Sequence, residues 1–140
     1  MKPSLKPGIQ YQHRFVVPKT KTVPALYPES EEFVAMPEVF ATGFLVGFLE
    51  WTCIKAINEH IDWPHEQTVG THICVSHSAA TPAGLEVTAS VELIEVDGRK
   101  LVFSVRAHDG IDQISEGRHE RFVINRERFN EKLRAKVAGA

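Results

Sequence analysis

The longest apolar stretch of the chain constrains its fold most. Between Val39 and Ile57 only Glu50 and Lys55 are ionisable. A helix that is apolar around its whole circumference belongs in the interior of a protein, because no face of it suits water. We therefore predict a long buried helix over residues 38–61.

Glu50 is the anomaly of this helix. A carboxylate in an apolar interior has a large desolvation cost unless it is paired, hydrogen-bonded or protonated. At about 100° per residue, Gly43, Val46 and Gly47 lie within roughly 60° of Glu50 on the helix, so little side-chain bulk surrounds the acid. The pattern is typical of a ligand-binding hollow; the alternative is a close backbone contact where Glu50 pairs with an Arg or Lys.

The composition limits the classes of protein that fit. A chain of 140 residues predicts one domain, 1–140. A net charge of -2 gives no basic surface for nucleic acid. The apolar stretch approaches the ~20 residues of a membrane span, but its central carboxylate and the lack of a second span argue against a membrane protein. The first residues contain no apolar secretion signal, so we expect a cytoplasmic protein.

Cysteine and histidine spacing predicts no metal site. Cys53 falls in the apolar stretch and Cys74 in a strand-like segment, and both are expected to be free, buried thiols. His72 and His77 stand five residues apart in that segment and would point to opposite faces of a strand. His77 shares the apolar face, where a histidine is either a satisfied core residue or a catalyst.

Two-residue alternation predicts an antiparallel sheet. Strands are expected over residues 10–17, 70–79, 85–93, 101–107 and 112–125, with Asp97-Gly98 as a hairpin turn. The inner face of such a sheet must cover something, and only the long helix is apolar enough. The sheet should therefore wrap the helix in an α+β fold.

Shorter helices are expected on either side of this unit. Ser30 is an N-cap candidate for a short helix that carries Phe33 and Met36 and ends at Pro37, which also suits the first turn of the long helix. This short helix is either a lid over Glu50 or a surface helix that plugs the core. Asn125 can cap a C-terminal helix with an apolar edge at every fourth residue.

A set of motifs in this order resembles the fluoroacetyl-CoA thioesterase family over almost the whole chain. The motifs are Pro28-Glu29-Ser30, Pro37-Glu38-Val39-Phe40-Ala41-Thr42-Gly43-Phe44, Gly47, Glu50-Trp51, Gly70-Thr71, Ile73-Cys74-Val75, His77-Ser78-Ala79-Ala80-Thr81-Pro82, Ala107-His108-Asp109-Gly110 and His119-Glu120-Arg121. The resemblance implies a hotdog fold, catalytic roles for Thr42, Glu50 and His77, and a backbone N–H of Gly70 near the thioester carbonyl. It also implies a homodimer formed by sheet extension, for which the strand that contains Cys74 and Ser76 is the expected edge.

These residue types suit thioester hydrolysis. The reaction passes through a tetrahedral oxyanion, which a fixed N–H donor such as that of Gly70 stabilises. Glu50 could attack the carbonyl to form a mixed anhydride or could deprotonate water. His77, with an ordinary pKa near ~6.5, is the expected proton carrier, and the Thr42 hydroxyl would orient Glu50 or the carbonyl.

The resemblance also assigns substrate contacts. Val23, Leu26, Phe33 and Met36 are expected to line the acyl pocket under the lid, with Met36 where fluoroacetyl-selective enzymes have a second phenylalanine. Methionine fills a pocket more loosely than a phenyl ring, so fluorine discrimination is expected to be weaker. Arg121 either meets the charged coenzyme A moiety or is an ordinary surface ion-pair partner.

The expected function is hydrolysis of a short-chain acyl-CoA, such as fluoroacetyl-CoA, to the free acid and coenzyme A. No cofactor is expected, since coenzyme A is part of the substrate. Hotdog hydratases are a weaker alternative, because their Asp/His motif is not found. A non-catalytic module that binds acyl-CoA or another hydrophobic ligand remains the main alternative, with Glu50 and His77 forming only a buried hydrogen bond.

Overall fold

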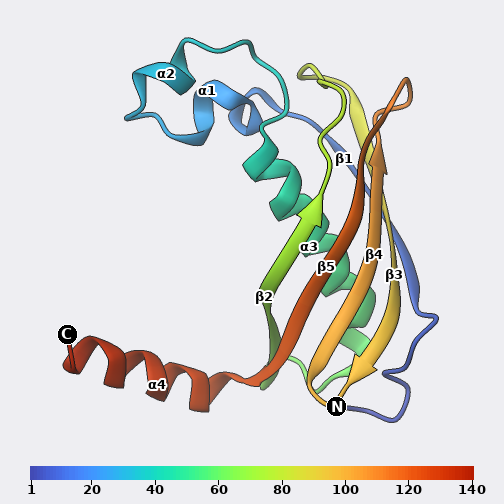
Figure 1. The fold of residues 1–140 in the computed structure, drawn as a ribbon, viewed down its shortest axis with the longest axis vertical. Helices are drawn as coiled ribbons and strands as arrows, with labels where there is room; N and C mark the ends of the chain where they lie inside the picture. The colour runs from blue at the N-terminus through green and yellow to red at the C-terminus, as the bar shows by residue number, and fades with distance from the viewer.

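A five-stranded antiparallel sheet curls around one long helix in the computed structural model, which describes all 140 residues (Figure 1). The strands are β1 (Gln10–Val16), β2 (Glu66–Val75), β3 (Glu86–Asp97), β4 (Lys100–His108) and β5 (Gln113–Asn125), and their order in the sheet is β1-β3-β4-β5-β2. The central helix is α3 (Thr42–Ile57). The α+β fold with a wrapped helix is confirmed, and β2 lies at an edge of the sheet, as expected.

The remaining elements are short or lie outside this unit. They are the 3-10 turns η1 (Lys19–Lys21) and η2 (Asn58–His60), and the helices α1 (Val23–Leu26), α2 (Glu31–Val34) and α4 (Arg126–Ala138). Helices α1 and α2 lie beyond the N-terminal end of α3, and α4 projects from the opposite end of the molecule (Figure 1).

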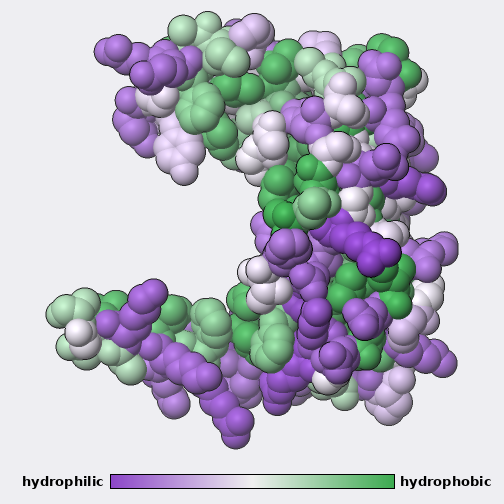
Figure 2. All heavy atoms as spheres, viewed as in Figure 1, coloured by the Kyte–Doolittle hydropathy of each residue, from purple (hydrophilic) through white to green (hydrophobic).

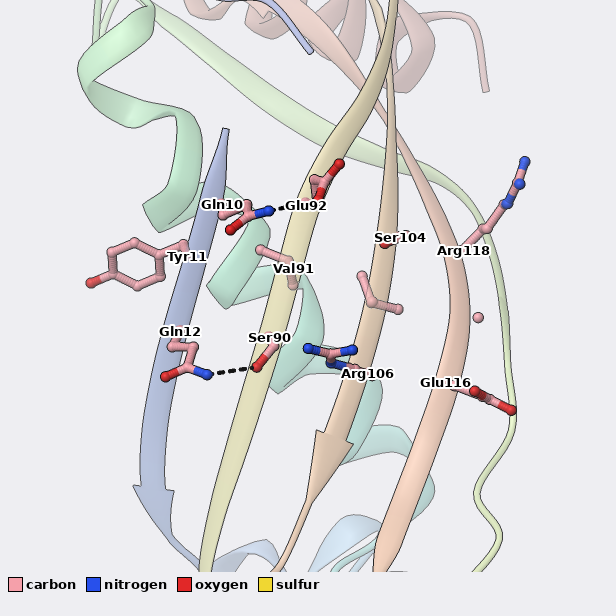
Figure 3. A pocket seen from close by; sticks show the side chains of 12 residues that line it. Gln10, Tyr11, Gln12, Ser90, Val91, Glu92, Ser104, Arg106, Glu116 and Arg118 are labelled. Atoms are coloured by element: carbon pink, nitrogen blue, oxygen red, sulfur yellow. Dashed lines mark hydrogen bonds between the residues drawn. The ribbon is translucent and has the colours of Figure 1, made fainter. Parts of the chain in front are cut away.

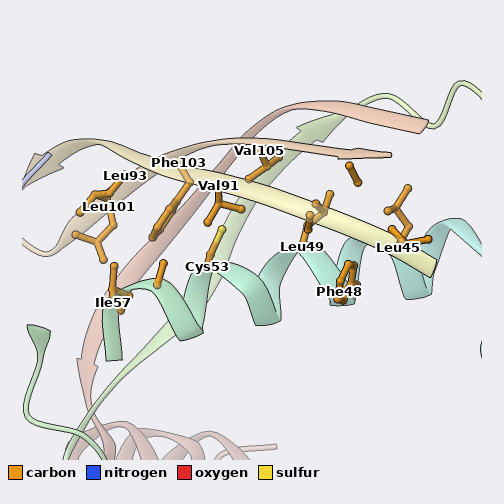
Figure 4. Close-up of a cluster of buried hydrophobic side chains, with 14 of the residues drawn as sticks. Leu45, Phe48, Leu49, Cys53, Ile57, Val91, Leu93, Leu101, Phe103 and Val105 are labelled. Atoms are coloured by element: carbon orange, nitrogen blue, oxygen red, sulfur yellow. The ribbon is translucent and has the colours of Figure 1, made fainter. Parts of the chain in front are cut away.

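The core lies between α3 and the concave face of the sheet (Figure 4). Leu45, Leu49 and Cys53 project from one side of the helix and are fully buried. They meet the inward residues of β3 and β4, among them Leu93 and Phe103. Each large side chain buried here contributes roughly 1.5–3 kcal/mol, so this interface fixes which side of α3 faces inward.

The central helix differs from the prediction at its start. It begins at Thr42 rather than residue 38, so Pro37 does not occupy its first turn. The preceding backbone is extended and pairs with a distant loop: Phe40 N–H donates to the Thr81 carbonyl at 2.7 Å, and Val39 bridges Pro82. These long-range hydrogen bonds replace the helical turn that the local sequence favours.

The prediction that α3 is buried on all sides is also wrong for the single chain. Gly43, Gly47, Trp51 and Lys55 are exposed along one side of the helix. A single curled sheet covers only the opposite side. An apolar helix therefore keeps an open stripe, and this stripe lies on the same side as Glu50.

Strand β2 is shifted toward the N-terminus relative to the prediction. It starts at Glu66 and ends at Val75, so His77 lies in the loop that follows it. The pairing of β2 with β5 is irregular between Gly70 and His72. Cys53 is buried as expected, but Cys74 is exposed, because it points away from the core on an edge strand.

The hairpin and capping predictions are confirmed. Asp97 pairs with Lys100 across a two-residue turn, where Gly98 has a φ of +59°. The Asn125 side chain accepts a hydrogen bond from Arg128 N–H and caps α4. No residue of α4 is buried, and Leu133 and Val137 on its apolar edge are exposed. None of the helices is long and apolar enough to cross a membrane.

The single chain has a concave side (Figure 2). The α1–α2 region and the projecting α4 flank a wide notch, and strand β2 is the sheet edge nearest to it (Figures 1 and 2).

Candidate active site

Thr42 and His77 form the first polar group of the site. Thr42 is the first residue of α3, and its Oγ1 lies 2.7 Å from Nδ1 of His77. Hydrogen bonds from Ser76 N–H and Ser78 N–H to the backbone of Glu116 and Ile114 fix the loop on both sides of His77. The predicted proximity of Thr42 to His77 is therefore a direct contact.

One nitrogen of His77 remains unsatisfied. Its Nε2 is buried and has no hydrogen-bond partner. Burial also lowers the pKa of His77 below the ordinary value, which favours the neutral ring at pH 7. A neutral imidazole with one engaged and one unengaged nitrogen is suited to exchanging a proton with a bound molecule.

Glu50 forms a second polar group, two helical turns after Thr42. Its Oε1 accepts a hydrogen bond of 2.9 Å from Arg121 Nη1, and the Glu50 side chain is 37% exposed. Its Oε2 has no hydrogen-bond partner within the chain. The interpretation that Glu50 pairs with a basic residue is thus confirmed, while one carboxylate oxygen stays free.

Gly70 allows the strand to pass close to this carboxylate. A Cβ atom at position 70 would lie 2.5 Å from Glu50 Oε1, a separation that side chains do not tolerate. A Cβ atom at Gly47, in contrast, would meet no other atom within 4 Å and would face open space. The glycine that makes room for the acid is therefore on β2 and not on the helix itself.

Arg121 is buried rather than displayed at the surface. Its exposure is 3%, and besides Glu50 it donates from Nε to Thr68 Oγ1 and from Nη2 to the Thr68 carbonyl, both at 2.8 Å. The interpretation of Arg121 as an ordinary surface ion-pair partner is wrong. A contact of Arg121 with coenzyme A stays a prediction.

His119 is a member of this group that the sequence reasoning missed. It is 2% exposed, its Nε2 lies 3.0 Å from Arg121 Nη1, and its distance from Nε2 to Glu50 Oε1 is 3.9 Å. His119, Arg121 and Val123 alternate along β5 and all three are buried. That alternation was the available signal, because it places His119 and Arg121 side by side on the inner face.

The two polar groups are separate within one chain. None of the hydrogen bonds or ion pairs joins Glu50 to His77 or Thr42. Eight residues separate Thr42 from Glu50, which corresponds to about 12 Å along a helix. Glu50 and His77 therefore make no direct contact within one chain, and a hollow shared by the two side chains stays a prediction.

Cys53 is not a competing nucleophile. It lies in the core beside Glu50 and Arg121, and burial raises the pKa of its thiol to about 12. Nucleophilic cysteines instead have a lowered pKa. No group of three or more His, Cys, Asp or Glu side chains is arranged to hold a metal ion.

The lid residues gather over the start of α3. A methyl group of Leu26 lies 3.1 Å from the position of a Cβ at Gly43, and Val23 N–H donates to the Val39 carbonyl. The Phe33 ring stacks on Tyr27 with centroids 5.9 Å apart, and Met36 is 51% exposed. Helix α2 buries no residue, so the alternative that it plugs the core is wrong.

A wide hollow lies elsewhere on the molecule. It occupies the outer face of the sheet, has a volume of about 790 Å³ and is lined mainly by polar side chains such as Gln12, Ser90 and Arg106 (Figure 3). A smaller apolar pocket of about 220 Å³ lies between β1 and α3. Neither contains Thr42, Glu50 or His77. Neither of these two hollows is therefore the site that the sequence predicts.

Comparison with known structures places this architecture in a class. A Thermus thermophilus protein described as a thioesterase superfamily member superposes with a TM-score of 0.82 at 22% identity over the full length of both chains. A hot-dog-like protein from Thermanaerovibrio acidaminovorans superposes with a TM-score of 0.78 at 19% identity over 96% of this chain and 93% of its own. The sheet wrapped around α3 is therefore the hotdog fold.

More similar proteins define the family. Residues 21–127 match the family model described as fluoroacetyl-CoA-specific thioesterase. The fluoroacetyl-CoA thioesterase of Streptantibioticus cattleyicolor is 54% identical over 137 residues, 98% of each chain. A crystal structure of the fluoroacetyl-CoA thioesterase FlK superposes with a TM-score of 0.92 at 53% identity, over 95% of this chain and 98% of that one. The chain belongs to the fluoroacetyl-CoA-specific thioesterase family, as the motifs indicated.

Proposed function

We propose that the protein hydrolyses short-chain acyl-CoA thioesters, fluoroacetyl-CoA or a related small acyl-CoA, to the free acid and coenzyme A. The observation that carries the proposal is the Glu50 carboxylate, which is held by Arg121 through one oxygen against the backbone of Gly70 in a chain of this family. Structures of FlK in complex with acetyl-CoA and with fluoroacetate and CoA support a substrate of this chemical class.

The proposed chemistry uses the free oxygen of Glu50. Either Oε2 attacks the acyl carbon to give a mixed anhydride that water then hydrolyses, or it removes a proton from an attacking water. In both routes the carbonyl oxygen becomes an oxyanion, which we assign to the Gly70 N–H. The C–S bond then breaks and coenzyme A leaves as a thiolate.

His77 carries a proton from water to the thiolate: its neutral Nε2 takes the proton of the water that is consumed, directly or from Glu50, and returns it to the sulfur of coenzyme A. Its unsatisfied Nε2 is the atom available for this transfer, and the contact with Thr42 fixes the ring. The proposed steps need only groups of the protein chain and water, and coenzyme A is part of the substrate.

We infer that two copies of the chain complete the site. Glu50 and His77 do not meet within one chain, yet thioester hydrolysis by this set needs them at one reacting centre. Strand β2 is an edge strand whose backbone can extend the sheet into a second copy, and the exposed stripe of α3 lies on the open side of the same molecule. Light scattering with size-exclusion chromatography tests for the homodimer, and a monomeric active protein would contradict it.

We propose a cytoplasmic location on chemical grounds. Both cysteines are free, and the exposed Cys74 thiol fits a reducing compartment.

Release of free thiol tests the function directly. Wild type should release coenzyme A from acetyl-CoA and fluoroacetyl-CoA, and Glu50→Gln should lose at least about 100-fold in kcat, because it removes the reacting carboxylate but keeps the shape. Glu59→Gln is the matched control, since the Glu59 side chain is 85% exposed and lies outside the site. Binding of acyl-CoA without thiol release by wild type would favour a non-catalytic binding module.

A further inference from the structure

His119 has a contact at each ring nitrogen although it is almost fully buried. Its Nδ1 lies 2.8 Å from the His72 carbonyl on β2, and its Nε2 lies 3.0 Å from Nη1 of Arg121. The side chain is 2% exposed. Water therefore does not supply alternative partners, and the protein groups decide where the proton of the ring resides.

The partners fix one tautomer. A carbonyl oxygen only accepts hydrogen bonds, so Nδ1 must carry the hydrogen. A guanidinium only donates, so Nε2 must present its lone pair to Arg121 Nη1. The ring is consequently neutral, with its hydrogen on Nδ1.

The environment holds this neutral form. Burial and then the Arg121 charge lower the pKa of His119, while the His72 carbonyl, Glu50 and Glu120 oppose the shift. The neighbouring groups come from β2, α3 and β5. The cation closest to His119 is Arg121, so a proton on Nε2 would face a positive charge at 3.0 Å.

The neutral ring determines how Arg121 meets Glu50. Nη1 has two hydrogens, of which one goes to Glu50 Oε1 and the other to His119 Nε2. The Nε and Nη2 atoms of Arg121 are both bonded to Thr68. With Nη1 shared in this way, the guanidinium contacts only one carboxylate oxygen instead of forming the two-pronged pair that Arg and Glu readily form.

We propose that His119 is a positioning residue that holds Arg121 on Oε1 of Glu50 and thereby keeps Oε2 free for the thioester or the attacking water. The proposal rests on the proposed function of Glu50. Removal of the acceptor at Nε2 leaves a buried hydrogen of Arg121 Nη1 without a partner, and Oε2 of Glu50 can then turn to accept it while Thr68 still holds Nε and Nη2. Protonation of Nε2 would have the same consequence, because the acceptor becomes a donor.

Two substitutions separate positioning from packing. His119→Leu keeps bulk but removes both polar atoms, and His119→Gln keeps an oxygen that can accept from Arg121. We expect His119→Leu to lower kcat at least tenfold with KM within threefold of wild type. His119→Gln should restore kcat to within about threefold of wild type and remove any loss of activity at acid pH that arises from His119. His65→Gln is the matched control, since the His65 side chain is 62% exposed.

The outcomes are distinguishable from failure of the proposed function. Wild-type kcat and an unchanged pH profile in His119→Leu, alongside an inactive Glu50→Gln, would overturn the positioning role and leave the thioesterase intact. Equal losses in folded His119→Leu and His119→Gln would also overturn it, because they would indicate packing alone. Absence of thiol release by wild type would instead contradict the proposed function.

One further test uses the wild-type protein alone, so it needs neither an activity assay nor a folded variant. Two-dimensional proton–nitrogen NMR of the imidazoles at pH 7 should show His119 as neutral with hydrogen on Nδ1. A protonated ring, or hydrogen on Nε2, would overturn the proposal whatever the kinetics show.

Discussion

The two polar groups along α3 differ in how fully their hydrogen bonds are satisfied. At the first residue of the helix, His77 has one partner, Thr42, and a buried nitrogen with none. Two turns later, every nitrogen of Arg121 and His119 has a partner. The first group is thus ready to exchange a proton, and the second is built to stay fixed while one oxygen of Glu50 remains free.

Because of this difference, substitutions in the first group should affect mainly the chemistry, and substitutions in the second should also affect stability. Loss of a group from the Thr42–His77 pair leaves few broken contacts. Loss of a group from the Glu50–Arg121–His119 cluster leaves buried donors without partners, which costs about 1–3 kcal/mol for each unsatisfied group.

The largest kinetic effect with the least structural damage should come from His77→Gln. We expect kcat to fall by about 10²–10⁴, the range of a general acid–base group, while the urea midpoint of unfolding stays close to that of wild type. Thiol-release kinetics and urea unfolding followed by circular dichroism measure the two quantities. A large loss of unfolding free energy in His77→Gln would instead show that His77 stabilises the fold. The two polar groups would then not differ in the way described above.

Gly70→Ala should damage both activity and stability. The added Cβ would lie 2.5 Å from Glu50 Oε1, so the carboxylate or β2 must move. We expect a loss of about 100-fold in kcat and of about 1–3 kcal/mol in unfolding free energy, as for other overpacked sites. Gly47→Ala is the control: its Cβ meets no atom within 4 Å, and helix propensity alone should stabilise the fold by about 0.5–1 kcal/mol. Equal effects of the two substitutions would contradict the close approach at Gly70.

Activity should depend on pH through His77. Its pKa is lowered by burial, so the neutral ring persists as the pH falls below the ordinary histidine value of ~6.5. The acid limb of kcat/KM should therefore lie below pH 6.5. The same lowered pKa means that the unfolded chain binds the proton first, so stability declines as the pH falls from ~6.5. Kinetics and urea unfolding between pH 5 and 8 test both, and an acid limb above pH 6.5 would contradict the assignment to a buried His77.

Thr42→Val should have a smaller effect than His77→Gln, because the hydroxyl only orients the ring. We expect about a tenfold loss in kcat. In the double variant with His77→Gln the losses should not add, since the two residues form one contact. Additive losses would show that Thr42 acts independently of His77.

Met36→Phe should change specificity only. Met36 is 51% exposed in the lid region and supports none of the core. A phenyl ring should raise the preference for fluoroacetyl-CoA over acetyl-CoA by roughly three- to tenfold, because closing one gap in an apolar pocket is worth on the order of 1 kcal/mol. Competition assays with both thioesters measure the ratio of the two kcat/KM values. An unchanged ratio would show that Met36 does not determine the preference for fluoroacetyl-CoA.

Local sequence patterns predicted most of the fold. Alternation identified the strands, Asp97-Gly98 marked a hairpin, and Ser30 and Asn125 were found as helix caps, because each of these features depends on neighbouring residues only. The start of α3 could not be found in this way. It depends on the hydrogen bond between Phe40 and Thr81, which lie 41 positions apart in sequence.

The sequence predicted residues of the candidate site, but it did not predict which of these residues contact one another. Thr42, Glu50, His77 and Gly70 were named from the sequence, but Arg121 as the partner of Glu50 and the role of His119 were not. The β2–β5 register sets Gly70 opposite Arg121, and no local pattern encodes that register.

Hydrophobic periodicity is a local property of the chain, so the amino-acid order is enough to establish a long apolar helix with one acid and an alternating sheet that covers it. Folding in three dimensions leaves one side of this helix uncovered, sets Arg121 and His119 on a single oxygen of Glu50, and leaves one nitrogen of His77 free. These outcomes depend on distances between residues far apart in sequence, and hydrogen bonds form only where folding brings donor and acceptor within about 3 Å.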